Sequence, residues 1–251
     1  MAMSVRKIIN HINLHTYFIK PCSKSLMISL WHNEETKALL SPNPDVSPSA
    51  ESITRCLNQL SQQGFTKVFT SALLPHQSKA FIDCGFQIEK KLAVLSRDLE
   101  SLPYWKKSST YNLRRATRKD RSKVLEVDSA SFPQFWRLTN KTLAEAIHAT
   151  SYTRFEIATP IESEDIILGY AITGQSEDKG FLQRLAVNPT YQHLGIGKSL
   201  VLDGLWWLKK RGATKITVNT EVNNFKALCL YHNLGFALQP TEMHVLSTKI
   251  N

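Results

Sequence analysis

The stretch FLQRLAVNPTYQHLGIGKS, residues 181–199, decides the fold expected for this chain of 251 residues. Residues 181–187 have the apolar character of a strand, which Asn188 and Pro189 end. Glycines follow at positions 195 and 197, and residues 198–211 have the apolar spacing of a helix. Glycine lets the backbone come close to a bulky anion, and a helix N-terminus offers unpaired N–H groups and a positive dipole end. The stretch therefore predicts a binding site for a pyrophosphate.

The two common nucleotide-binding motifs do not fit this loop. The pattern GxGxxG requires a third glycine where Leu200 stands, and GxxxxGK[ST] requires a glycine where Gln192 stands. Lys198 lies in the first turn of the expected helix, where a cation is unfavourable unless an anion binds nearby. The loop therefore indicates an anion site of a different kind.

Outward from this stretch, the chain repeats itself. Residues 64–86 read GFTKVFTSALLPHQSKAFIDCGF, and residues 212–236 read GATKITVNTEVNNFKALCLYHNLGF. Both begin with Gly-x-Thr-Lys, continue with a β-rich run and a helical stretch, and end with Gly-Phe. An amphipathic helix precedes each copy, and a short apolar run follows it. A duplicated helix–strand–helix–strand unit is the simplest explanation. The break falls where Pro103 and a polar, basic run interrupt the pattern, which predicts domains at residues 1–102 and 113–251 joined by a basic linker, 103–112.

Composition excludes several classes of protein. Hydrophobic residues make up 42% and charged residues 21% of the chain, which is typical of a globular protein. No run approaches the roughly 18 apolar residues of a membrane span, and residues 1–20 have no pattern of a secretory signal. The four cysteines show no CxxC spacing, so we expect reduced thiols and a cytoplasmic location.

The net charge of +10 is concentrated in one segment. Residues 101–123 hold eight basic side chains and one acidic side chain, whereas residues 124–251 hold twelve of each sign. A solvated connector is one interpretation of this segment. The other is a patch that steers RNA or an acidic protein, although the few aromatic residues nearby do not make a stacking platform.

The second half resembles the GNAT acetyltransferases over about residues 110–251. The motifs in order are LRRAT at 113–117, SFPQFW at 131–136, Gln-x-x-Gly-x-Gly at 192–197 after a strand ending in Val-x-Pro, a strand at 214–221, NNFKA at 223–227 and LYHNLGF at 230–236. SFPQFW is similar to RimI-like and some mycothiol-synthase-like members, and the tandem layout is similar to that of mycothiol synthases. The resemblance implies an α/β fold of two tandem GNAT-like domains, each a mostly antiparallel mixed sheet flanked by helices. The first domain lacks the glycine loop and has Phe81 where the second has Tyr231, so it is expected to be an inactive copy that supports or shapes the other.

The resemblance also implies acetyl-CoA as a cosubstrate bound at the glycine loop. The backbone of residues 185–187 would pair with the pantetheine arm, as an extended chain pairs with a strand edge. Backbone amides of the loop would bind the pyrophosphate, and Asn224 would contact the pantetheine or act as an ordinary N-cap. The expected cofactor-binding residues are Leu185, Ala186, Val187, Gln192, His193, Leu194, Gly195, Ile196, Gly197, Lys198 and Asn224.

Two residues are the candidates for catalysis. Tyr231 matches the general acid of the family, which would protonate the leaving thiolate. The family position for an acidic base is Asn219, which cannot serve, but Glu221 lies two residues on and on the same face of the strand. Glu221 is therefore a candidate base, with a solvated carboxylate at the strand end and a base acting through water as alternatives. Arg184 would select an anionic acceptor, or would be an outward-facing strand charge.

The function expected from this reasoning is acetyl transfer from acetyl-CoA to a primary amine by direct attack in a ternary complex. The acceptor would be a protein N-terminus or a small amine, with no membrane partner, and the scattered histidines imply no metal. Because Asn219 is not a base, a CoA-binding pseudoenzyme or regulatory module without catalysis is the alternative. A nucleic-acid-associated protein that uses residues 106–123 is the third and least favoured hypothesis.

Overall fold

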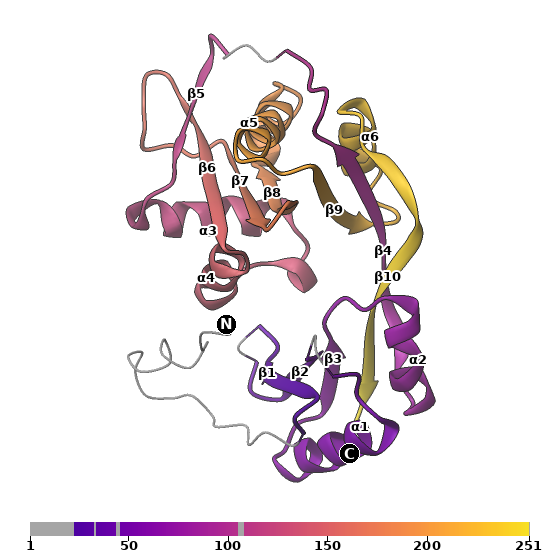
Figure 1. Ribbon diagram of the computed structural model, residues 1–251. Helices are drawn as coiled ribbons and strands as arrows, with labels where there is room; N and C mark the ends of the chain where they lie inside the picture. The colour runs from indigo at the N-terminus through magenta and orange to yellow at the C-terminus, as the bar shows by residue number, and fades with distance from the viewer. Residues whose placement is uncertain (1–22, 33, 44–45, 105–107, 251) are drawn as a thin grey trace.

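The computed structural model describes residues 23–32, 34–43, 46–104 and 108–250. Over these residues the chain forms a single mixed sheet of ten strands in the order β1-β2-β3-β10-β4-β9-β8-β7-β6-β5, flanked by helices (Figure 1). The expected α/β class with a mixed sheet is confirmed. The two sheets expected from the repeat are joined edge to edge into this one sheet.

The first half of the chain, up to β4, supplies four strands and two helices. Its elements are β1 (Leu26–Leu30), β2 (Lys37–Pro42), α1 (Ala50–Gln62), β3 (Lys67–Thr70), α2 (Pro75–Asp83) and β4 (Gln87–Asp98).

The second half, from β5 onward, is larger. Its elements are β5 (Tyr111–Arg115), η2 (Arg118–Asp120), α3 (Arg121–Ser131), η3 (Gln134–Trp136), α4 (Asn140–His148), β6 (Tyr152–Pro160), β7 (Gly169–Ser176), β8 (Lys179–Val187), η4 (Pro189–Tyr191), α5 (Ile196–Lys210), β9 (Lys215–Glu221), α6 (Phe225–Asn233) and β10 (Ala237–Lys249).

Helices cover both faces of the sheet in the second half. Successive residues of β7 point to opposite faces, so Ala171 packs with the core under α5, whereas Tyr170 and Ile172 pack with the core under α3 and α4. The apolar faces of α5 and α3 therefore hold β7 and β8 between them.

The two copies of the repeat end their helices in the same way. A glycine with positive φ, between 75° and 88°, follows each of the helices α1, α2, α5 and α6: Gly64, Gly85, Gly212 and Gly235. This left-handed conformation is strained for other residues, and it lets the next N–H bond back to the helix. Phe86 N donates to Phe81 O over 3.1 Å, and Phe236 N donates to Tyr231 O over 3.0 Å. Phe81 and Tyr231 thus occupy the same position relative to the end of their helices.

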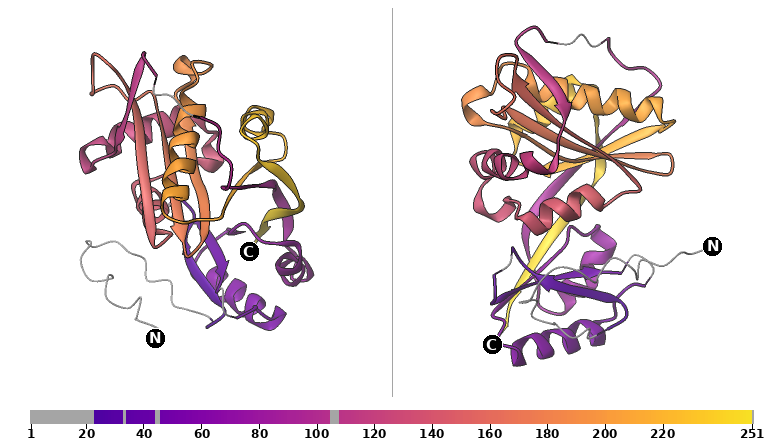
Figure 2. Two further views of the ribbon diagram at one scale, coloured as in Figure 1. Left: turned by 45° about the horizontal axis from the view of Figure 1, so that its top comes forward. Right: turned by 90° about the vertical axis from the view of Figure 1, so that its left-hand side faces the viewer.

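The two halves exchange their last strands. β4 pairs antiparallel with β9, Leu92–Asp98 opposite Glu221–Lys215, and pairs with β10 on its other edge. β10 continues past β4 to pair with β3, and Figure 2 shows it running from one half into the other. A boundary at residues 103–112 thus divides the chain in sequence, while β4 lies inside the sheet of the second half. The division into domains stays a prediction.

β8 and β9 part from each other along their length. They pair in parallel only from Lys179–Phe181 to Lys215–Thr217, although β8 runs on to Val187 and β9 to Glu221. On its other edge β8 has a bulge, because Ile172 and Thr173 of β7 lie opposite Arg184 and Leu182 and leave Gln183 unpaired. A bulge bends a strand and increases its twist. The C-terminal part of β8 therefore presents an open backbone edge toward β9.

Three expectations from the sequence concern features other than the fold: the state of the cysteines, a secretory signal and membrane spans. The expectation of reduced thiols is wrong for Cys56, which is disulfide-bonded, whereas Cys84 and Cys229 are free. Cys22 and the stretch inspected for a secretory signal lie outside the described residues. Over the described ranges, the structure has no helix long and apolar enough to cross a membrane.

A buried charge cluster lies between β6 and α5. Arg154 donates to Asp203 over 2.9 Å and to Glu156 Oε1 over 3.0 Å, while Glu156 Oε2 is buried without a partner among the described residues. Burial raises the pKa of Glu156 from its ordinary value of 4.5 to about 7. An acid with a raised pKa binds its proton more tightly when folded, so folding stability falls as the pH rises through this range.

We predict that Glu156→Gln stabilises the protein relative to wild type more at pH 8 than at pH 5. The amide removes the buried charge that the wild type must carry at pH 8, with a gain of a few kcal/mol at most, at about 1.4 kcal/mol per pKa unit. Urea unfolding of both proteins at the two pH values measures the difference, with exposed Glu162→Gln as control. An equal difference at both pH values would contradict the assignment of the raised pKa to Glu156.

Candidate active site

Two adjoining pockets lie along the open edge of β8. The first, which we call the cradle, has a volume of about 400 Å³ and lies between the C-terminal end of β8, the start of α5 and α6. The second, the inner pocket, has about 530 Å³ and lies between β8 and β9. They share lining residues from the end of α3, from β8 and from the start of α6: Ser131, Phe132, Leu185, Asn224 and Ala227.

The cradle has the features of a phosphate site. The N-cap of α5 is Gly195, whose φ of 79° is left-handed and which has no side chain to cap the helix. The first N–H groups of α5 therefore have no side-chain cap. Lys198 and Lys226 line the same pocket and add positive charge. This combination fits a diphosphate, because anions bind at helix N-termini through both the N–H groups and the dipole.

Gly197 keeps the cradle open. A Cβ added at this position would lie 3.5 Å from Val187 and from Leu230, in ordinary contact with both. A methyl group therefore fits there, whereas a longer side chain would extend into the cradle.

The structure brings nearly all of the expected cofactor-binding residues together in the cradle. Leu194 is the exception, because its side chain is 61% exposed and does not line the pocket. The residues that line it are Leu185, Ala186, Val187, Gln192, His193, Gly195, Ile196, Gly197, Lys198 and Asn224. Asn224 is also the N-cap of α6 and accepts a hydrogen bond from Ala227 N over 3.2 Å, so the capping role expected as an alternative is present.

Tyr231 lies in the inner pocket and is buried, with 5% of its surface exposed. Burial raises the pKa of its phenol well above the ordinary value, so the group keeps its proton at neutral pH. The ring packs against Phe236, at 5.5 Å between centroids. Among the described residues the hydroxyl has no hydrogen-bond partner, which leaves its proton available to an atom in the pocket.

Glu221 lines the same pocket at the end of β9, as does Asn219. Its Oε1 lies 2.9 Å from Lys90 Nζ on β4, so a residue of the first half holds the carboxylate in place. The side chain is one-fifth exposed. It is neither buried in the core nor fully solvated, and its second oxygen is not part of the ion pair.

The position of Arg184 agrees with neither of the two roles expected for it. It is largely buried, and its Nε donates to Asp128 Oδ2 over 2.8 Å while its Nη2 donates to Trp136 O over 2.7 Å. Its guanidinium also stacks on Phe132 at 3.5 Å. The charge is neutralised by a fully buried carboxylate, so Arg184 is not an outward-facing strand charge and is not free to bind an anionic acceptor.

Asp128, at the wall of the inner pocket, was not among the residues expected from the sequence. Besides Arg184, it accepts hydrogen bonds from Tyr170 Oη over 2.6 Å and from Leu138 N over 2.7 Å. It thereby ties α3, β7, β8 and the chain after η3 together at the wall of the inner pocket. The available signal was a carboxylate directly after the apolar Val127 and three residues before the SFPQFW motif.

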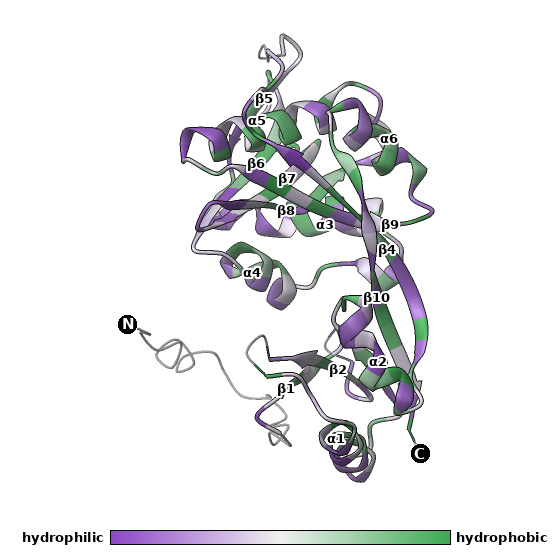
Figure 3. Ribbon diagram, turned by 45° about the vertical axis from the view of Figure 1, so that its right-hand side comes forward, coloured by the Kyte–Doolittle hydropathy of each residue, from purple (hydrophilic) through white to green (hydrophobic). Residues whose placement is uncertain are grey.

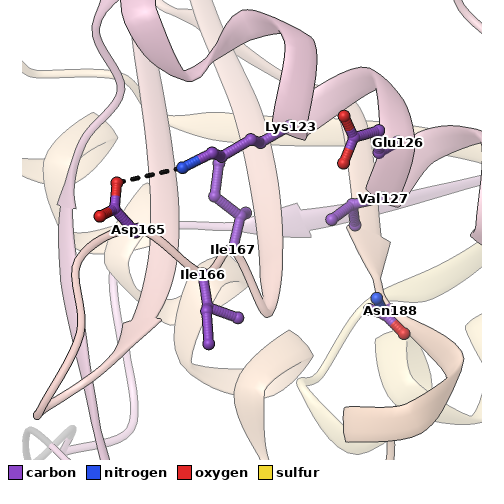
Figure 4. Close-up of a pocket in the computed structure, with 7 residues that line it drawn as sticks. All are labelled: Lys123, Glu126, Val127, Asp165, Ile166, Ile167 and Asn188. Carbon is purple, nitrogen blue, oxygen red and sulfur yellow. Dashed lines mark hydrogen bonds and ion pairs between the residues drawn. The ribbon is translucent and has the colours of Figure 1, made fainter.

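The basic segment is partly neutralised within its own region. Arg114 donates to both oxygens of Asp120, over 2.9 and 2.8 Å, and holds the pKa of that carboxyl well below its usual range. Lys123 Nζ lies 3.1 Å from Asp165 in a further pocket of about 280 Å³ between α3 and the chain before β7 (Figure 4). The expected site residues do not line that pocket. Lys106 and Lys107 lie outside the described residues.

No cluster of three or more His, Cys, Asp or Glu side chains that could hold a metal ion occurs in the part of the chain that the structure describes.

Comparison with known proteins supports a shared family over much of the second half. Residues 121–236 match the acetyltransferase (GNAT) family. The mycothiol acetyltransferase of a Nocardioides species is 27% identical over 182 residues, which is 64% of this chain and 62% of that protein. A ribosomal-protein alanine N-acetyltransferase of Escherichia coli is 36% identical over 67 residues, 27% of this chain and 45% of that protein. The chain thus covers less than two thirds of either relative.

Solved structures share the fold over more of the chain. A GCN5-related N-acetyltransferase from Sphaerobacter thermophilus has a TM-score of 0.64 at 11% identity, covering 90% of this chain and 77% of that chain. A tandem GNAT protein from the clavulanic acid biosynthesis pathway also has a TM-score of 0.64, at 12% identity, covering 85% of this chain and 75% of that chain. Residues 121–236 therefore match the GNAT family of acetyltransferases, and the described chain shares its fold with tandem GNAT proteins.

Proposed function

We propose that this protein transfers the acetyl group of acetyl-CoA to a primary amine by direct attack within a ternary complex. The observation that carries the proposal is the junction of the two pockets. A cradle with an uncapped helix N-terminus opens directly into a pocket that holds a protonated phenol and a carboxylate. An acyl donor with a diphosphate and a primary amine would thus meet beside Tyr231 and Glu221.

The cradle and the open edge of β8 would hold the cosubstrate. N–H groups at the start of α5, with Lys198 and Lys226, would bind the diphosphate. The backbone of residues 185–187, which β9 leaves unpaired, would take the amide-containing arm as an added strand. Acetyl-CoA bound in this way supplies the thioester that the amine attacks.

The residues of the inner pocket would carry the proton transfers. Glu221 takes a proton from the ammonium group, so that the nitrogen has a free electron pair. The nitrogen then attacks the thioester carbon, a C–N bond forms and the C–S bond breaks. Tyr231 donates its proton to the leaving sulfur. The nitrogen loses its second proton as the amide forms, and this proton restores the phenol, whose raised pKa keeps it protonated at neutral pH. Holding amine and thioester in contact supplies a large part of the rate enhancement.

The acceptor belongs to the same proposal. The names of the similar proteins include both a ribosomal-protein alanine and mycothiol as acetylated molecules. A protein N-terminus and a small amine are accordingly the two classes of acceptor that we propose.

We predict that Gly197→Glu abolishes acetyl-CoA binding, weakening it at least 100-fold. The carboxylate would fill the cradle and repel the phosphates, whereas Gly197→Ala, with its Cβ in ordinary contact, should bind as the wild type does. Isothermal titration of acetyl-CoA into each protein measures this, and Gly195→Glu should behave as Gly197→Glu does. Lys210→Ala at the far end of α5 controls for charge. A wild type that does not bind acetyl-CoA, or a Gly197→Glu variant that binds normally, would sink the proposal.

We predict that Tyr231→Phe lowers kcat by about 10²–10⁴-fold, the usual contribution of a general acid, and leaves the KM for acetyl-CoA within about twofold. The hydroxyl has no partner among the described residues, so its removal should not change folding stability. Tyr191→Phe, in the cradle but away from the inner pocket, is the matched control. Release of the CoA thiol in the presence of an acetylated amine gives the rate. An unchanged kcat would contradict the acid role, whereas a wild type that binds acetyl-CoA without any turnover would favour the pseudoenzyme alternative.

We predict that Glu221→Gln lowers kcat/KM at neutral pH at least 100-fold, and that the loss shrinks as the pH rises because the amine then arrives deprotonated. Lys90→Gln breaks the same ion pair but keeps the carboxylate. Since a partly exposed pair contributes about 1 kcal/mol or less to stability, this control should keep activity within a few-fold. Equal losses in both variants would show that the ion pair, and not a base, is what matters.

A further inference from the structure

The inner pocket continues toward the first half of the chain. A pocket of about 180 Å³, which we call the seam pocket, is lined by β1 and β2 from the first half and by η3 and α4 from the second. Trp136 and Arg184 line both the seam pocket and the inner pocket. Figures 1 and 3 show α4 on the side of the second half that faces β1 and β2. The three pockets thus follow one another: cradle, inner pocket, seam pocket.

The first half fixes the wall between the inner and seam pockets. Trp31 stacks on Phe69 at 4.3 Å and contacts the Phe135 ring at 5.0 Å, and His32 Nε2 is hydrogen-bonded to Phe135 O over 2.9 Å. Phe135 in turn packs edge-on against Trp136 at 4.7 Å. The segment η3 is therefore held by aromatic residues of β3 and of the chain after β1.

The walls of the seam pocket are mainly apolar. Leucine side chains from both halves and three aromatic rings contribute: Leu30, Trp31, Leu39, Phe135, Trp136 and Leu138. The one charge at its inner end, Arg184, is neutralised by buried Asp128. Lys141 and Glu145 lie together on α4, 4.0 Å apart and about half exposed, at the outer side. The interior is therefore suited to an uncharged, apolar group and unsuited to a phosphate or a carboxylate.

The size of the pocket defines the occupant further. A cavity of about 150 Å³ holds a benzene ring, so 180 Å³ leaves room for one ring or a branched aliphatic group. The Nε1 of Trp136 is buried without a hydrogen-bond partner among the described residues. Because this nitrogen has almost no accessible surface, an atom in the pocket does not reach it, and it places no requirement on the occupant.

We propose that the seam pocket is the recognition subsite for the acceptor, and that the acceptor is a primary amine carrying an aromatic or bulky apolar group. This inference rests on the proposed acetyl transfer for the position of the amine, in the inner pocket. Trp31, a residue of the half without a glycine loop, is then a determinant of acceptor specificity.

The test compares L-phenylalaninamide with glycinamide, which share an α-amine and a carbonyl and differ in the benzyl group. Wild type should show at least a tenfold higher kcat/KM for L-phenylalaninamide. Trp31→Ala should reduce that ratio to near one by raising the KM for L-phenylalaninamide far more than the KM for glycinamide. Trp31→Phe should keep most of the preference, and Met27→Ala, exposed on the adjoining strand β1, should keep all of it. Equal losses for both amides would mean a merely structural role for Trp31 and would overturn the proposal.

Two further measurements test the seam pocket independently of Trp31→Ala. Glu145→Trp, at the exposed side of the pocket, should obstruct it and remove the preference even if Trp31→Ala does not fold. Calorimetric titration of each amide into protein saturated with CoA measures recognition without turnover. L-phenylalaninamide that binds no better than glycinamide, or a preference that survives both variants, overturns the seam pocket assignment. A wild type that fails to bind acetyl-CoA but binds L-phenylalaninamide through Trp31 overturns the proposed function alone.

Discussion

The pairing of β4 with β9 is the interaction on which the candidate site depends. β9 has two edges, and β8 occupies one of them only as far as Thr217. Beyond that point the backbone of residues 218–221 would have no neighbour on either side if β4 did not pair with the other edge through Glu221. Unpaired backbone groups in a sheet are costly, so an open wedge between β8 and β9 requires this support. The first half, which lacks the glycine loop, supplies β4, and the pairing of β4 with β9 stabilises the open wedge.

The opposite wall of the wedge is held by a buried charge pair. Asp128 is inaccessible to solvent and accepts hydrogen bonds from Arg184, Tyr170 and Leu138. A buried pair of this kind adds little net stability, but the loss of one partner leaves an uncompensated charge and costs about 3–5 kcal/mol. Its consequence here is geometric, because it fixes the bulged part of β8 against α3. Both walls are thus set before any ligand arrives, which is the condition for positioning to accelerate a reaction.

Local features of the site could be predicted from the sequence, whereas its long-range contacts could not. The loop at 192–198, the four helix-ending glycines and the equivalence of Tyr231 with Phe81 depend on turn geometry and on spacing within a few residues. The pairing of Arg184 with Asp128 joins residues 56 positions apart, and Glu221 meets Lys90 only because β4 lies beside β9. A repeat in the sequence indicates two similar units. The repeat does not indicate whether each unit keeps its own last strand, β4 or β10. A sheet with exchanged last strands and a sheet without the exchange would contain equivalent strand pairs.

The strand exchange also determines when the sheet of the first half can be completed during synthesis of the chain. β3 finds its neighbour on one side in β10, which follows it by nearly the whole length of the second half. While the ribosome is still adding the second half, β3 has β2 beside it and an unoccupied edge on the other side. Contacts of such long sequence separation form slowly, because loop closure must precede them. The nascent first half thus carries an exposed strand edge, the kind of surface on which chains pair wrongly with one another, and its sheet closes only when β10 has been made.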